Sequence, residues 1–262
     1  MKSTFLFITG LALAFIFASC EKTGPEGPSG TNGTNGPAGP LLTGTLEGYV
    51  THYDVSGSKM TSNLGGDTVT IDSLNITSIT NTAGLYTFTG LKTGIYNVTI
   101  IHSGFGILQI PSMSFLGGGI IFHNASLSLI PVTNLTAFSA SDSTSKTNVK
   151  YIYIKGTLPI VNYNQSVIVY VSNPGSTLVN SLPVNESSSY VITINPGVGT
   201  FSKLIQMQDF YDLQYNPGVT VYFAAYIIGA STGSSSYTDP ASGKTIYTAL
   251  SSTPLFSNST VE

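Results

Sequence analysis

The chain has 262 residues, enough for two domains of ordinary size, and it combines 41% hydrophobic with only 8% charged residues. Burial of this much apolar surface can offset the entropy lost on folding, so the bulk of the chain is predicted to be ordered. The net charge is −3, and the nine basic residues are all lysines scattered along the chain, which excludes the clustered positive charge that nucleic-acid binding requires.

The first 19 residues have the pattern of a secretory signal peptide. Lys2 precedes an apolar run at 5–18, and the small residue Ser19 precedes Cys20. The apolar run is too short to span a bilayer comfortably. An ordinary secretory peptide followed by an incidental cysteine is the alternative interpretation, but Cys20 is the only cysteine in the chain and has no partner for an internal disulfide.

The segment that ends at this cysteine, Phe17-Ala18-Ser19-Cys20, resembles the lipobox of bacterial lipoproteins. In that family the cysteine receives diacylglycerol and becomes the mature N-terminus. Phe17 departs from the leucine that the family usually has at this position. The resemblance implies a lipid anchor on Cys20 and a place in the cell envelope, which we expect to be the outer membrane or the cell surface.

Residues 20–42 are predicted to be an extended spacer. Glycine recurs at every third position from Gly24 to Gly39, a period that is typical of collagen. Because the repeat is short and bacterial chains lack hydroxyproline, we expect a polyproline-like stalk that lifts the folded part off the membrane. A trimerising triple helix is the alternative.

Residues 43–131 are predicted to form a first β-sandwich, because short β-rich runs alternate with Gly, Asn and Asp clusters. Leu46, Gly48 and Val50 should share one face of a strand, and Val69 and Ile71 should begin another after the turn at 65–67. The segment 84–100 predicts one hairpin with a turn over 90–94 and Leu91 in the core beneath it. The inward residues expected in its two strands are Tyr86, Phe88, Tyr96, Val98 and Ile100.

This segment, with Gly104-Phe105 and a closing strand near 125–129, resembles the carboxypeptidase regulatory-like family. The resemblance covers about a third of the chain. It implies a transthyretin-like sandwich of seven strands that accompanies other domains and carries no catalytic residues of its own.

Residues 132–262 are predicted to form a second sandwich. The expected strands are 132–139, 149–154, 166–171, 190–194, 201–207, 219–228 and 246–250, with a turn at 141–147 and a long loop at 231–244. The segment from Leu213 through Pro217-Gly218 to Tyr226 resembles the corner before the sixth strand of fibronectin type III domains. The usual core tryptophan of that family is absent, so an unrelated immunoglobulin-like sandwich remains an alternative.

No motif for catalysis is found in the sequence. It contains neither G-x-S-x-G nor H-E-x-x-H, and the only cysteine is expected to be acylated. His52, His102 and His123 have no Glu or His at metal-ligand spacing, so they are predicted to be strand or loop residues and no metal is expected. We therefore expect no enzyme activity and no cofactor.

The predicted fold is thus all-β, with two tandem β-sandwiches, transthyretin-like and then fibronectin III/Ig-like, after a signal peptide and a linker. The leading functional hypothesis is a non-catalytic, lipid-anchored envelope protein that displays these sandwiches for adhesion or scaffolding and binds a carbohydrate or protein partner. A carbohydrate-binding surface protein and a pilus-like subunit are the alternatives. The candidate ligand-binding residues are Tyr163, Tyr211, Tyr215 and Tyr237. The sequence leaves the oligomeric state open.

Overall fold

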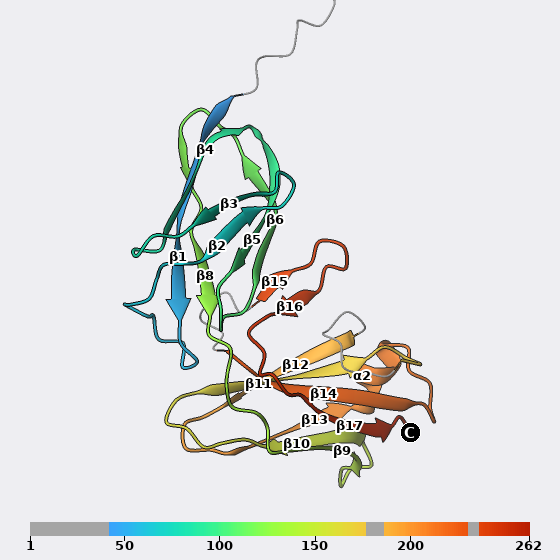
Figure 1. The fold of residues 1–262 in the computed structure, drawn as a ribbon. Coiled ribbons are helices and arrows are strands. Elements are labelled where there is room, and N and C mark those ends of the chain that lie inside the picture. The colour runs from blue at the N-terminus through green and yellow to red at the C-terminus, as the bar shows by residue number, and fades with distance from the viewer. Residues whose placement is uncertain (1–41, 177–185, 230–235) are drawn as a thin grey trace, which may run out of the picture. The chain divides into compact units, whose positions relative to one another are not determined.

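The computed structural model describes residues 42–176, 186–229 and 236–262. The predicted signal peptide, Cys20 and the spacer up to residue 41 lie outside the described residues. The described part is almost entirely β, with one short helix, and it forms two tandem β-sandwiches (Figure 1). The predicted fold class is therefore confirmed.

In the described parts of the chain, none of the helices has the length and the apolar composition that a membrane crossing requires.

The first sandwich consists of two sheets. One sheet has the order β4-β1-β7, with β8 also paired to β1, and the other has the order β3-β2-β5-β6. The strands are β1 (Thr43–Tyr53), β2 (Thr68–Ile71), β3 (Ile76–Ile79), β4 (Leu85–Lys92), β5 (Gly94–Ile101), β6 (Leu108–Phe115), β7 (Ile120–Phe122) and β8 (Ala125–Ser128).

Strands β7 and β8 are two parts of one interrupted strand that runs parallel to β1. Thr45 is opposite Ile120 in β7 and Val50 is opposite Ala125 in β8, which is the same register offset. At the interruption, the backbone N–H of Tyr49 donates to Oδ1 of Asn124 at 2.9 Å. A side chain thus replaces one link of the backbone ladder.

The predicted hairpin at 84–100 is wrong in its connectivity. β4 pairs with β1, whereas β5 pairs with β2 and β6, so the chain passes from one sheet to the other near Thr93. The predicted inward residues are all buried, as is Leu91. Alternation shows which side chains face inward but not which strand is the partner, so it is the same for a hairpin and for a crossing between sheets.

The inward face of β1 is confirmed by the burial of Leu46, Gly48 and Val50. Gly48 has no space for a side chain, because a Cβ there would overlap the backbone carbonyl oxygen of His123 and lie 2.7 Å from the hydroxyl oxygen of Tyr86. The Tyr86 hydroxyl donates to that same carbonyl at 2.6 Å. Glycine at this position therefore allows three segments to meet.

The second sandwich has a three-stranded sheet of order β13-β10-β9 and a four-stranded sheet of order β12-β11-β14-β17. A short helix, α2 (Met207–Asp212), connects β13 to β14. The strands are β9 (Ala137–Thr144), β10 (Lys150–Thr157), β11 (Gln165–Ser172), β12 (Glu186–Ile194), β13 (Thr200–Gln206), β14 (Thr220–Ile228) and β17 (Leu255–Thr260). The core between the sheets includes four fully buried residues, Ile152, Val169, Phe210 and Phe223.

Three expectations for this sandwich need correction. β9 extends through Thr144, into the segment predicted as a turn. The last strand of the sandwich is β17 rather than 246–250, and its Ser- and Thr-rich sequence lacks the apolar alternation that would have revealed it. The predicted loop at 231–244 contains β15 (Ser236–Thr238), which pairs with β16 (Thr245–Tyr247).

Candidate functional site

A cluster of polar residues lies between the two sheets of the first sandwich. His52 follows Leu46 and Val50 in the inward phase of β1. Asp67 directly precedes β2, and His102 directly follows β5. Since Thr68 is opposite Ile101, the next positions in the register bring Asp67 beside His102. Alternate strand residues face the same side, so all three side chains are directed toward the interior.

One carboxylate oxygen is shared by the two imidazoles of this cluster. Oδ1 of Asp67 lies 2.7 Å from Nε2 of His52 and 2.9 Å from Nδ1 of His102. The side chains of His52 and Asp67 are fully buried, and that of His102 is 22% exposed. The ligand atoms of all three residues lie within 4.8 Å of one another, a grouping that could hold a metal ion.

The remaining polar atoms of His52 and Asp67 are fixed by neighbouring residues. Nδ1 of His52 lies 2.9 Å from the carbonyl oxygen of Asn63, so this ring nitrogen carries the proton and donates. The Thr80 hydroxyl donates to Oδ2 of Asp67 at 2.8 Å. The remaining atoms, Nε2 of His52 and Oδ1 of Asp67, are hydrogen bonded to each other at 2.7 Å.

His102 is held differently from His52. Its Nδ1 is buried and lies 2.9 Å from Oδ1 of Asp67. The two atoms are close enough for a hydrogen bond, but their angles do not allow one. The Phe105 ring packs against both imidazoles, with ring centroids 4.4 Å from His52 and 5.1 Å from His102. The cluster thus has an apolar wall and one imidazole nitrogen without a hydrogen bond.

Ligand spacing along the chain does not reveal this cluster, because its three residues are far apart in sequence. The signal lies instead in the predicted strand phases. His52 continues the inward series of Leu46, Gly48 and Val50, and His102 continues that of Val98 and Ile100. A histidine or aspartate in an inward phase must find a polar partner, since burial without one is costly.

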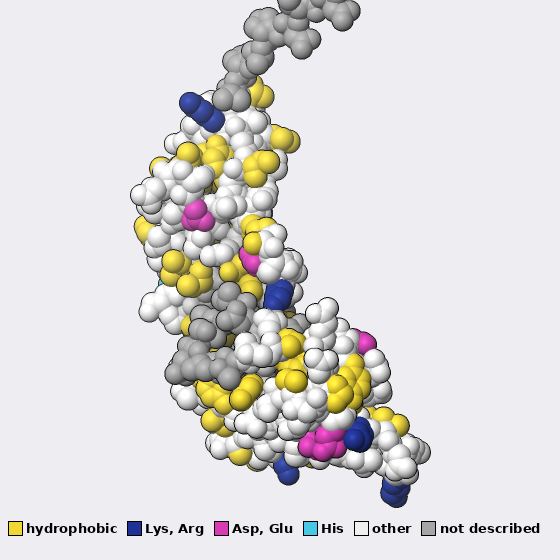
Figure 2. Space-filling model, turned by 90° about the vertical axis from the view of Figure 1, so that its right-hand side faces the viewer, with side chains coloured by type: hydrophobic (Ala, Val, Ile, Leu, Met, Phe, Trp, Pro, Cys, Tyr) yellow, Lys and Arg dark blue, Asp and Glu magenta, His cyan; other side chains and the backbone are white. Residues whose placement is uncertain are grey.

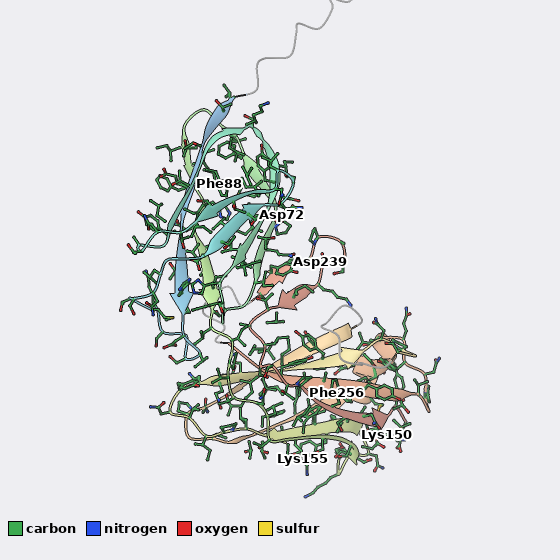
Figure 3. The ribbon with its side chains drawn as sticks, in the orientation of Figure 1. Asp72, Phe88, Lys150, Lys155, Asp239 and Phe256 are labelled. Carbon is green, nitrogen blue, oxygen red and sulfur yellow. The ribbon has the colours of Figure 1, made fainter. Side chains whose placement is uncertain are left out.

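A second candidate site is a groove of about 450 Å³ on the three-stranded sheet of the second sandwich. Phe138 and Phe201 stack within it, with ring centroids 6.3 Å apart and planes at 20°. Gly156 has no space for a side chain, because a Cβ would lie 2.5 Å from the Phe201 ring. Tyr153 and Lys155 of β10 also line the groove, and Lys155 is labelled in Figure 3. Hydroxyl groups on its rim come from Ser139, Thr157, Thr200 and Ser202.

None of the four predicted ligand-binding tyrosines lines this groove. Tyr215 is corrected as a candidate, because it is 2% exposed and its hydroxyl is hydrogen bonded to Ser172, which leaves no surface for a ligand. Tyr211, in α2, is 36% exposed and donates to the backbone oxygen of Glu262. Tyr163, in the connection before β11, and Tyr237, in β15, are half-buried. Burial raises the pKa of both phenols.

The visible surface is mainly uncharged and polar. In Figure 2, lysine and acidic side chains are few, and the apolar side chains form small patches. This agrees with the 8% of charged residues in the sequence.

Comparisons with known proteins give structural similarities at low scores. No family model matches the chain, and no curated protein matches it by sequence. A mutant type II cohesin–X-dockerin complex from Acetivibrio cellulolyticus matches 32% of this chain at 17% identity and a TM-score of 0.28, and the match spans 57% of that chain. A protein of Bacteroides uniformis to which carbohydrate binding has been attributed matches 82% of this chain and 98% of its own, at 11% identity and a TM-score of 0.28.

A DUF3823 family protein from Parabacteroides merdae matches 81% of this chain and 98% of its own, at 13% identity and a TM-score of 0.27. The major pilin subunit SpaD of Corynebacterium diphtheriae is also similar, at 11% identity and a TM-score of 0.25. Similarity at this level carries no information on activity. The proposals below therefore depend on the residues of this chain.

Proposed function

We propose that this protein is a non-catalytic lipoprotein of the cell envelope, anchored through Cys20, that displays two β-sandwiches for adhesion or scaffolding. The observation that carries the proposal is the order of parts along the chain. A lipobox-like segment and a glycine-repeat spacer precede two sandwiches, each with a hydrophobic core of its own. A tether followed by independently packed sandwiches suits the presentation of a surface away from a membrane.

The hydrogen bonds of three carboxylates among the described residues support a structural role for them. Asp54 accepts hydrogen bonds from the backbone and hydroxyl groups of the turn at 56–58, and Asp239 does the same for Ser242. Asp142 accepts from Ser259, which links β9 to β17. These carboxylates stabilise turns and strand contacts.

Metabolic labelling tests the anchor. Cells that express the full chain are grown with a palmitate analogue, and a Cys20→Ser variant is the matched control. We expect label on the wild-type protein only, together with its loss from the membrane fraction in the variant. Equal labelling of both proteins, or of neither, would refute the anchor, and turnover of a substrate in a broad hydrolase screen would refute the non-catalytic role.

Carbohydrate binding is the second candidate function, and the groove on the three-stranded sheet favours it. Its volume lies within the range of small-molecule sites, roughly 300–1,000 Å³. Tyr153, which faces outward from β10, provides an aromatic surface on which the apolar face of a sugar ring can stack, and the hydroxyl groups on the rim can bind its polar groups. The neutral ligand that this lining fits best is a polysaccharide without charged groups.

A glycan array probed with the full chain in detergent tests this candidate. Tyr153→Ala removes an outward-facing aromatic residue of the groove, and Phe256→Ala removes an exposed one from β17 in the other sheet (Figure 3). We expect glycan signals that disappear in the first variant and persist in the second. An array without signal for the wild-type protein, or identical signals for both variants, would exclude the groove as a sugar site.

A further inference from the structure

We propose that His52, Asp67 and His102 form a binding site for one zinc ion that joins the two sheets of the first sandwich. The two imidazole nitrogens and one carboxylate oxygen converge within 4.8 Å, on segments that are distant in sequence. Zinc binds this set of donors, with bonds of about 2.0–2.2 Å, whereas calcium and magnesium prefer oxygen donors alone.

The polar atoms that meet in the cluster favour a bound cation. Nδ1 of His52 donates to the carbonyl oxygen of Asn63, and Nε2 of His52 is hydrogen bonded to Oδ1 of Asp67 at 2.7 Å inside the core. Nδ1 of His102 is buried beside the same oxygen without a hydrogen bond. A metal ion in place of the proton between His52 and Asp67 would also give Nδ1 of His102 a partner.

The residues around the cluster also resemble the surroundings of a metal site. Histidine ligands of metals almost always donate their other ring N–H to a carbonyl or carboxylate, and carboxylate ligands are themselves hydrogen bonded. His52 donates to the carbonyl oxygen of Asn63, and Asp67 accepts from the hydroxyl of Thr80. These contacts orient the two fully buried side chains for coordination. Phe105 excludes water from one side.

The cluster needs only a small movement to admit a zinc ion. Ligand atoms of a tetrahedral zinc site lie about 3.3 Å apart, so the contacts of 2.7 and 2.9 Å must open by about half an ångström when the ion enters. His102 can move, because it is partly exposed. A surface depression is lined by Asn63 and Thr80, which contact His52 and Asp67, so the cluster lies close to the surface.

The ion would act as a clamp within the fold. β1 belongs to one sheet, whereas Asp67 and His102 adjoin β2 and β5 of the other. A ligand that binds only the folded state stabilises it, so zinc should raise the melting temperature of the first sandwich. This inference is independent of the lipid anchor and of the groove in the second sandwich.

Calorimetric titration of the full chain with zinc chloride, in detergent and after removal of metals with EDTA, tests the proposal. We expect one zinc ion per chain. His102→Ala should abolish binding, and it is the variant most able to fold because His102 is the most exposed of the three. Thr80→Val removes the hydroxyl that donates to Oδ2 of Asp67 and accepts from the backbone N–H of Asp67, and it should weaken binding about 10- to 100-fold.

His123→Ala is the matched control, since His123 lies in the same sandwich outside the cluster and should leave zinc binding unchanged. Cobalt should give visible d–d absorption with wild-type protein and none with His102→Ala. Melting curves in EDTA establish that each variant is folded. Absence of zinc binding by the wild-type protein, or equal affinity in His102→Ala, would overturn the proposal and leave a buried His–Asp ion pair in its place.

Discussion

Replacement of Gly48 by alanine should destabilise the first sandwich by an amount that the structure allows us to estimate. The added Cβ would overlap the carbonyl oxygen of His123, which belongs to the backbone and cannot rotate away. The segment between β7 and β8 must therefore move away from β1. That movement breaks three hydrogen bonds, in which Tyr86 donates to His123, His123 to Glu47, and Tyr49 to Asn124.

Each such hydrogen bond contributes about 0.5–1.5 kcal/mol. Forcing an extra carbon into a packed region costs about 1–3 kcal/mol more, and alanine returns about 0.4–1 kcal/mol by restricting the unfolded chain. We therefore expect Gly48→Ala to lower the free energy of unfolding by roughly 4 kcal/mol. This is a large part of the stability of an ordinary domain.

Urea unfolding measures this change. Because the chain has no tryptophan and 15 tyrosines, tyrosine fluorescence and circular dichroism are the suitable signals. Gly119→Ala is the control: it lies in the connection before β7, and a Cβ there would meet nothing within 4 Å. We expect Gly119→Ala to change stability by less than about 0.5 kcal/mol. A Gly48→Ala variant as stable as this control would refute the close approach of β1 and His123.

Two further predictions concern buried tyrosines. Burial raises the pKa of Tyr86 to about 12 from 10.0, so between these pH values the unfolded chain loses this proton first and stability falls by up to about 2.7 kcal/mol. Urea unfolding at about pH 9 and pH 11.5 should show a smaller loss in Tyr86→Phe than in the wild-type protein, and equal losses would contradict the shift. Tyr215→Phe should cost about 1 kcal/mol in thermal unfolding by removing the buried contact with Ser172, whereas Tyr211→Phe, at an exposed position, should cost less.

Strand positions and inward faces could largely be predicted from the sequence. Leu46, Val50, Val69 and Ile71 occupy the core as alternation required. Pairing could not be predicted, because alternation is the same for a hairpin and for the passage from β4 to β5 between sheets. β17 was missed because its stability comes from backbone pairing with β14 rather than from an apolar face.

The candidate sites were harder to predict than the strands. His52, Asp67 and His102 are widely separated in sequence, and only the packing of two sheets brings them together. The groove similarly depends on Phe138 and Phe201 coming from different strands and meeting beside Gly156. The prediction of four ligand-binding tyrosines rests on residue type alone, which carries no information on burial. Tyr215 is buried and is therefore excluded as a ligand-binding residue.

The position of β1 at the start of the first sandwich affects the order of folding. All of its partners, β4, β7 and β8, come later in the chain, and the last of them ends at Ser128. An emerging chain must therefore keep the open edge of β1 unpaired until almost the whole first sandwich has been made. Contacts of such long sequence separation form slowly, and an unpaired edge is prone to aggregate. A chain truncated before Ser128 should thus depend on a chaperone to remain in solution.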